Sequence, residues 1–204
     1  KILSCSNDLL IMVNDIFDAS RLEAQTLKAD SRPLKLTTFL IDLKSDYAYL
    51  LDKELVVNWD YPPDLPSINT DGAKLRQILQ NLISNAIKFT ERGEVTVSAR
   101  VIEGVGDQQS GVGTGPRPPI PVARWLEFKV KDTGIGIPRE SLSSIFGIFQ
   151  QGDSSARRSH GGIGLGLYIV QKFTDMLGGT VAVTSEPGKG STFTGRLPVN
   201  DISK

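Results

Sequence analysis

The stretch NLISNAIKFT, from Asn81 to Thr90, lies in a longer segment whose apolar residues recur every three or four positions. This spacing predicts a helix from Gly72 to Thr90, and Asp71 is a residue type that favours the N-cap of such a helix. One face of the helix is expected in the core, and it carries Leu75, Ile78, Leu79, Leu82, Ile83, Ala86 and Ile87.

A polar line runs beside this apolar face, because Asn81, Asn85 and Lys88 are four and three residues apart. Asparagine is a weak helix former, so two of them inside a helix carry a local cost. Amide oxygens can ligate Mg²⁺, and a lysine one turn away can neutralise phosphate. The line is therefore either a metal and phosphate site or a solvated helix face.

Strand patterns lie on both sides of this helix. The expected strands are Leu55 to Asp60, Glu94 to Val101, Trp125 to Lys131, Thr180 to Thr184 and Thr192 to Leu197. A strand and a helix are also expected between Leu34 and Ala48, and a second apolar helix should end at Gly178-Gly179. Together, these strands and helices predict an α+β fold, a two-layer sandwich whose mixed, mostly antiparallel sheet has its helices on one face.

Composition excludes several classes of protein. The 204 residues are 39% hydrophobic, and 23 basic residues balance 23 acidic ones, which is typical of a globular protein without a general anion-attracting surface. Nucleic acid is therefore not an expected partner. The single Cys5 and single His160 exclude an internal disulfide and Cys-rich or His-rich metal sites. No apolar run could span a bilayer, so we expect no direct membrane contact and a cytoplasmic location, with membrane anchoring of a longer parent protein left open.

The N-terminal segment carries a wide apolar stripe from Ile2 to Ala24, which predicts a helix with more than one partner surface. Either it joins a helical bundle or dimer stalk, or it folds back on its own domain. Because the chain begins without Met, we interpret it as a fragment with residues 1–25 as part of such a stalk and residues 26–204 as one domain. Residues 103–123 form a Gly/Pro-rich insertion in that domain, either a tolerated surface loop or a polyproline ligand.

Two glycine-rich segments offer ligand chemistry. DTGIGIP, residues 132–138, places the Asp132 carboxylate at a strand end, where it could accept from an exocyclic amine such as that of adenine. GGIGLGL, residues 161–167, leads into a helix N-terminus, which favours phosphate, although it lacks the lysine of a P-loop. Taken alone, the first could be a simple turn. The polar segment DSSARRSH, residues 153–160, could be a lid or an ordinary loop.

Together, and in this order, these segments resemble the ATP-binding catalytic domain of sensor histidine kinases, in the superfamily of gyrase, Hsp90 and MutL. NLISNAIKFT is similar to its N box, DTGIGIP to its G1 box, FGIF at 146–149 to its F box, and GGIGLGL to its G2 box. The resemblance runs from about Leu34 to Val199 and implies a Bergerat-type fold. Gly147 and Ile148 depart from the acidic residue and proline usual in the F box. NDIFDASRLEA, residues 14–24, is similar to the end of the second helix of the dimerisation and phosphotransfer hairpin.

The resemblance implies roles for individual residues. Asn85 and Asn81 would hold Mg²⁺ against the phosphates of ATP, with Lys88 on phosphate, and these three would be the catalytic residues. Asp132 would accept from the adenine amino group. The remaining nucleotide-binding residues would be Phe89, Gly134, Gly136, Ile137, Phe149, Gly162, Gly164, Leu165 and Gly166.

The implied function is an ATP-dependent protein-histidine kinase of a two-component system. Its acceptor histidine would lie on the first hairpin helix, N-terminal to this chain, and a response-regulator receiver domain would take the phosphoryl group onward. The N-terminal helix would contact a second copy of the chain. Related ATPases have a glutamate at the position of Asn81, so hydrolysis should be slow. The alternatives are a degenerate nucleotide-binding module without phosphotransfer and a serine/threonine kinase of the same fold.

Overall fold

The computed structural model describes residue 13 and residues 16–24, 26–48, 54–104, 123–148 and 164–199. Its main sheet has five strands, which lie in the order β2, β4, β5, β7, β6. Only β2 and β4 run parallel, and the other neighbours are antiparallel. The expected mixed, mostly antiparallel sheet is confirmed, with strands β2 (Leu55–Asp60), β4 (Gly93–Gly104), β5 (Ala123–Asp132), β6 (Thr180–Glu186) and β7 (Gly190–Pro198).

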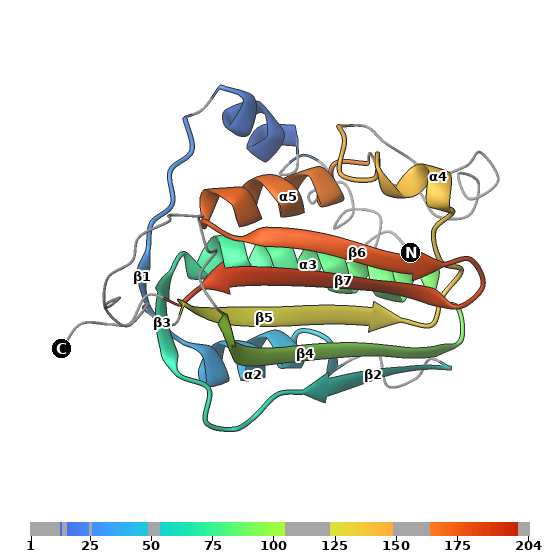
Figure 1. The fold of residues 1–204 in the computed structure, drawn as a ribbon, viewed down its shortest axis with the longest axis horizontal. Coiled ribbons are helices and arrows are strands. Elements are labelled where there is room, and N and C mark those ends of the chain that lie inside the picture. Colours follow the sequence, from blue (N-terminus) through green and yellow to red (C-terminus); the bar gives the residue numbers. More distant parts are fainter. Residues whose placement is uncertain are drawn as a thin grey trace, which may run out of the picture.

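The helices α2 (Leu36–Ser45), α3 (Gly72–Phe89) and α5 (Gly166–Met176) lie on one side of this sheet, and no helix of the described residues covers its other face (Figure 1). The core lies between the two layers, and the predicted apolar face of α3 supplies six of its buried side chains. Along β4, side chains alternate between buried and more exposed from Val95 to Arg100, as expected for a strand that is covered on one face.

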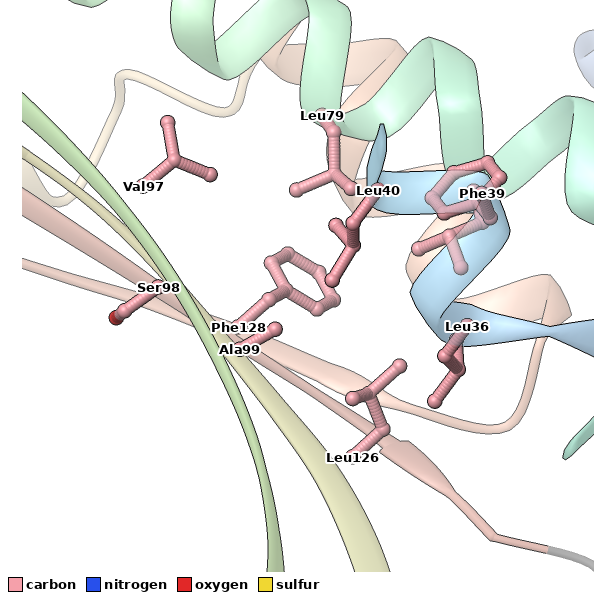
Figure 2. A pocket seen from close by; sticks show the side chains of 10 residues that line it. Leu36, Phe39, Leu40, Leu79, Val97, Ser98, Ala99, Leu126 and Phe128 are labelled. Atoms are coloured by element: carbon pink, nitrogen blue, oxygen red, sulfur yellow. The ribbon is translucent and has the colours of Figure 1, made fainter. Parts of the chain in front are cut away.

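A small cavity lies between α2, α3 and the sheet (Figure 2). It measures about 10 Å³, the space of a single water, and its walls are apolar side chains such as Phe39, Leu79 and Phe128. Ser98 borders it from β4, but its side chain points away from the cavity in Figure 2. The cavity is therefore a packing defect of the core rather than a ligand site.

Asp71 caps α3 as predicted. Its Oδ1 accepts from the N–H groups of Ala73 and Lys74, both at 3.1 Å, and its Oδ2 accepts from Lys74 Nζ at 2.6 Å and the N–H of Asp30 at 2.9 Å. Burial alone would raise the pKa of Asp71, but these hydrogen bonds hold the pKa below its ordinary value. The cap therefore also ties the incoming chain at Asp30 to the start of α3.

Of three short elements, only the strand expected near Leu34 follows from the sequence patterns. Strand β1 (Arg32–Lys35) pairs antiparallel with β3 (Ser67–Thr70), and the two form a separate small sheet. The short helix α4 (Arg139–Leu142) follows the DTGIGIP segment. We predicted neither β3 nor α4, because four residues are too few to establish a period. The expected insertion at 103–123 lies outside the described residues, apart from its two ends.

Residues 16–23 are helical, and this N-terminal helical segment contacts the rest of the chain. Ala19 and Leu22 pack against the core, while Phe17 is 61% exposed. Gln77 Nε2 on α3 donates to Asp18 Oδ2 at 2.7 Å. One side of the segment thus folds back on the domain, and its other side remains apolar and open. Within the described part of the chain, no helix is long and apolar enough to cross a membrane.

Candidate functional site

Asp132 is the last residue of β5, and its side chain is only 5% exposed. Its Oδ1 accepts from the N–H of Gly134 at 2.9 Å and from the N–H of Ser191 at 3.2 Å. Among the described residues none donates to Oδ2, which leaves this oxygen for a donor from outside. Burial raises the pKa of Asp132, and the two backbone N–H groups offset part of that rise.

The turn after Asp132 is packed so closely that it requires glycine. A Cβ on Gly134 would lie 2.2 Å from the carbonyl oxygen of Phe89, at the end of α3. Gly136 has a φ of +70°, and its Cβ would lie 2.2 Å from the carbonyl oxygen of Glu186. The turn is therefore wedged between the end of α3 and the turn that joins β6 to β7.

A hydroxyl group on β6 makes hydrogen bonds that hold the same turn in place. Ser185 Oγ accepts from the N–H of Ile137 at 2.7 Å and donates to the carbonyl oxygen of Gly190 at 2.9 Å. Ser191 Oγ lies 3.0 Å from Ser185 Oγ. We did not predict Ser185 as a site residue. The only signal in the sequence is its place beside a glycine-rich hairpin turn, and such a place is common.

The polar line on α3 is not a solvated face. Asn81, Asn85 and Lys88 are all partly buried, and Asn81 Nδ2 is buried without a hydrogen-bond partner among the described residues. Burial lowers the pKa of Lys88, whose Nζ lies 5.1 Å from the centre of the Phe89 ring. An unpaired buried amide N–H is costly in a ligand-free protein, so it points to a partner that the described part of the chain does not provide.

The N-terminus of α5 lies against this line. A Cβ on Gly166, the first residue of α5, would lie 3.3 Å from Asn81 Oδ1. Leu165 is the N-cap without a side-chain hydrogen bond, and the first turn contains no acidic residue. Gly164 has a φ of +77°, which turns the chain into the helix. Among the described residues no side chain caps the first N–H groups of α5, so these groups and the positive end of the helix dipole suit an anion.

The structure brings together most of the site residues expected from the sequence. The end of α3 meets the Asp132 turn at Phe89 and Gly134, and the middle of α3 meets α5 at Asn81 and Gly166. Ile137 packs against the core beside the turn. Phe149, Gly162 and His160 lie outside the described residues, so no contact of theirs is stated. The arrangement offers a carboxylate at one end and, at the other, the Asn81 amide beside the first N–H groups of α5.

A divalent cation would have to be held largely by oxygen atoms of its ligand. Among the described residues, no group of three or more His, Cys, Asp or Glu side chains could hold a metal ion. The amide oxygens of Asn81 and Asn85 are hard donors of the kind that Mg²⁺ accepts alongside phosphate oxygens and water. These two residues therefore fit a metal that arrives together with a phosphate ligand.

Comparison with known families gives one match that covers most of the chain. A family described as histidine kinase-, DNA gyrase B- and HSP90-like ATPase matches residues 70–201. The chain is similar to the aerobic respiration control sensor protein ArcB of Escherichia coli K12, with 40% identity over 89% of this chain. It is also similar to the signal transduction histidine-protein kinase BarA of the same strain, with 37% identity over 92% of the chain. The chain spans about a fifth of the length of these relatives, 21% and 19%.

Solved structures show the same fold. The crystal structure of full-length ShkA in complex with AMPPNP matches 96% of this chain with a TM-score of 0.74 and 30% identity, and 37% of that protein is covered. The Acinetobacter baumannii histidine kinase AdeS matches 98% of the chain, and 82% of AdeS is covered, with a TM-score of 0.68 and 22% identity. The second likeness extends to the fold alone.

Proposed function

The chain belongs to the histidine kinase-, DNA gyrase B- and HSP90-like ATPase family, and from this premise we propose that it is the catalytic domain of a sensor histidine kinase. It binds ATP with Mg²⁺ and passes the γ-phosphoryl group to a histidine outside this chain. The proposal rests mainly on one observation: the two ends of the site offer different chemical groups. Asp132, one of whose carboxylate oxygens has no donor among the described residues, lies at one end. The Asn81 amide nitrogen, which is likewise unpaired there, lies beside the N-terminus of α5 at the other end.

The Asp132 end suits the adenine base. Asp132 Oδ2 accepts from the exocyclic amine, while Oδ1 stays bound to the backbone of Gly134 and Ser191. Gly134 and Gly136 allow the base to approach the backbone closely, and Ile137 and Phe89 offer apolar surface to its plane. A guanine base would present its carbonyl oxygen to the carboxylate, so the pocket selects adenine by electrostatic repulsion.

The α5 end suits the triphosphate. The Asn81 amide N–H, the first N–H groups of α5 and the Lys88 ammonium group all favour negative charge. Asn85 and Asn81 hold Mg²⁺ through their amide oxygens, and Mg²⁺ supplies neutralisation of charge on the phosphates when bound. Gly164, with its φ of +77°, lets the chain before α5 turn toward the phosphates. The roles in nucleotide binding that the family resemblance implies for Gly162 and Phe149 remain predictions.

Catalysis by these residues is positioning and charge stabilisation. The acceptor histidine nitrogen attacks the γ-phosphorus and the bond to the bridging oxygen of ADP breaks, so the chain need only align the two reactants. Asparagine at position 81 is no general base, which keeps water a poor competitor. The phosphoryl group then passes to an aspartate on a receiver domain.

We further propose that the N-terminal helical segment contacts a second copy of the chain and that the domain works in the cytoplasm, where ATP is available.

Two measurements on the 204-residue chain test this function. ATP is titrated by calorimetry with and without Mg²⁺, and [γ-³²P]ATP is then supplied together with a separate protein that carries a dimerisation hairpin with its histidine. We expect Mg²⁺-dependent binding in the micromolar to millimolar range and label on the histidine. Asn85→Ala should abolish transfer. Asn58→Ala, on the exposed face of β2 where its amide bonds Glu94 at 3.1 Å, is the matched control and should leave transfer unchanged. Binding without any transfer would instead indicate a nucleotide-binding module.

A further inference from the structure

Thr90, at the C-terminal end of α3, carries a buried hydroxyl group that has no partner in the described part of the chain. The residue is 3% exposed, and Oγ1 makes no hydrogen bond among the described residues. Leaving a buried hydroxyl unpaired costs a folded protein stability, so such groups are rare and call for a specific explanation. Asn81 Nδ2 is the other such atom in the described chain, and it lies at the phosphate end of the proposed site.

The glycines around Thr90 show which way its hydroxyl group points. A Cβ built on Gly134 would lie 2.9 Å from Thr90 Oγ1, while a Cβ on Gly93 would lie 3.9 Å from the methyl group, Cγ2. The hydroxyl therefore faces the turn that follows Asp132, and the methyl group faces β4. Gly134 itself donates its N–H to Asp132 Oδ1 at 2.9 Å. Gly134 thus lies between the Thr90 hydroxyl and the Asp132 carboxylate, which we propose accepts from the adenine amino group.

We propose that Thr90 is a specificity-determining residue of the base pocket, whose hydroxyl donates a hydrogen bond toward ring nitrogen N1 of adenine. This inference rests on the proposed binding of ATP. The edge of adenine presents an amino group beside the acceptor N1, and Asp132 and Thr90 provide an acceptor and a donor in the same order. Guanine presents an acceptor and then a donor on this edge. In the ligand-free chain the Gly134 turn covers the hydroxyl, so the proposed hydrogen bond requires this turn to shift when the base binds.

The test compares two ligands on three proteins. ATP and 1-deazaadenosine triphosphate, which lacks N1, are titrated with Mg²⁺ into the wild-type chain, Thr90→Val and Thr90→Ser. We expect the wild type to prefer ATP by about tenfold, the value of one hydrogen bond. Thr90→Val should bind both ligands equally, because it loses affinity only for ATP. Thr90→Ser keeps the hydroxyl and should restore the preference. A preference for ATP that persists in Thr90→Val would overturn the inference.

Thermal unfolding of the ligand-free chain separates this role from a structural one. Thr90→Val removes an unpaired buried hydroxyl, so the melting temperature should stay the same or rise by roughly 2–4 °C. The matched control is Thr174→Val, since Thr174 is fully buried in α5 and its Oγ1 donates to the carbonyl oxygen of Val170 at 2.7 Å. This variant should lower the melting temperature and leave the preference for ATP unchanged.

The outcomes distinguish failure of the inference from failure of the proposed function. A wild-type chain that binds neither nucleotide contradicts the proposed function, and the role of Thr90 falls with it. A wild-type chain that binds both equally contradicts only the role of Thr90. A fall in the melting temperature of Thr90→Val as large as that of Thr174→Val would also contradict it, because the hydroxyl would then be paired in the free protein.

Discussion

The two ends of the proposed site are built in different ways. At the base end, Gly134 and Gly136 lie so close to backbone carbonyl groups that a Cβ would overlap them at 2.2 Å. At the phosphate end, a Cβ on Gly166 would meet only the side chain of Asn81, at 3.3 Å. The base end also has its backbone N–H groups bound to Asp132 and Ser185, whereas Asn81 Nδ2 remains unpaired.

This difference matches what each end has to bind. A neutral planar base is recognised by shape and by the hydrogen bonds of its edge, and both depend on the closely packed turn after Asp132. A triphosphate brings charge and a metal ion, so its end can leave donors unpaired and adjust around the ligand. Mutations at the base end should therefore damage the fold and the selection of the base together. Mutations at the phosphate end should affect binding more than folding.

Gly134→Ala should have the largest effect. The new Cβ would overlap the backbone of Phe89, so the turn after Asp132 must shift, and we expect a loss of about 3 kcal/mol in the free energy of unfolding, or roughly 6–12 °C in melting temperature. Gly188→Ala is the control, because Gly188 has a φ of +76° but no atom within 4 Å of the added Cβ. It should cost only the backbone strain, about 1 kcal/mol. Equal losses in both variants would mean that the turn is not rigidly packed.

Asp132→Asn should come next, and its effect should be on the nucleotide. The amide oxygen can still accept from Gly134 and Ser191, but the amide nitrogen would face the amino group of adenine as a second donor. We expect ATP affinity to fall about 30-fold, or about 2 kcal/mol, while GTP affinity rises relative to ATP. Titration with purine riboside triphosphate, which lacks the amino group, checks the cause. Its affinity should change little, and a 30-fold fall for this ligand too would contradict the assignment.

At the base end, only the residues that carry a local signal in the sequence could be predicted. Asp132 follows a strand and precedes two glycines, and Asp71 precedes an apolar period, so both were predicted and both structural settings are confirmed. Ser185 and Thr90 could not be identified in this way. Their importance depends on which backbone lies opposite them in the fold, and Gly134 is 44 residues from Thr90 in the chain. Contacts of that kind leave no period or spacing in a sequence.

The pH dependence of stability should distinguish the two buried carboxylates. Because the pKa of Asp132 is raised in the fold, the folded state holds a proton at pH values between 3.8 and the raised pKa, where the unfolded chain has lost it. Asp132→Asn should therefore be more stable than the wild type at neutral pH, and the gap should close as the pH falls through the raised pKa. Urea unfolding of both proteins from pH 7 to pH 4 measures this gap.

Asp71 serves as a control, because its pKa is shifted in the opposite direction from that of Asp132. Its pKa is lowered, so its stabilising contribution is present above pH 3.8 and is lost as the pH falls through the lowered value. Asp71→Asn should be less stable than the wild type at neutral pH and should approach it only in stronger acid. A stability gap of the same sign in Asp71→Asn and Asp132→Asn would contradict the assignment of Asp132 as a charge buried for binding.

Gly166→Ala should have the smallest effect on folding. It therefore tests most directly whether the phosphate end is less rigidly packed than the base end. Alanine is the better helix former, and the neighbouring atom at 3.3 Å is the end of the Asn81 side chain, which can move by a few tenths of an ångström. The free energy of unfolding should change by less than about 1 kcal/mol. ATP affinity should still fall about threefold to tenfold, because the displaced Asn81 amide no longer meets the phosphates. If Gly166→Ala instead unfolds the chain as Gly134→Ala does, the phosphate end is as rigid as the base end, and the distinction between the two ends is wrong.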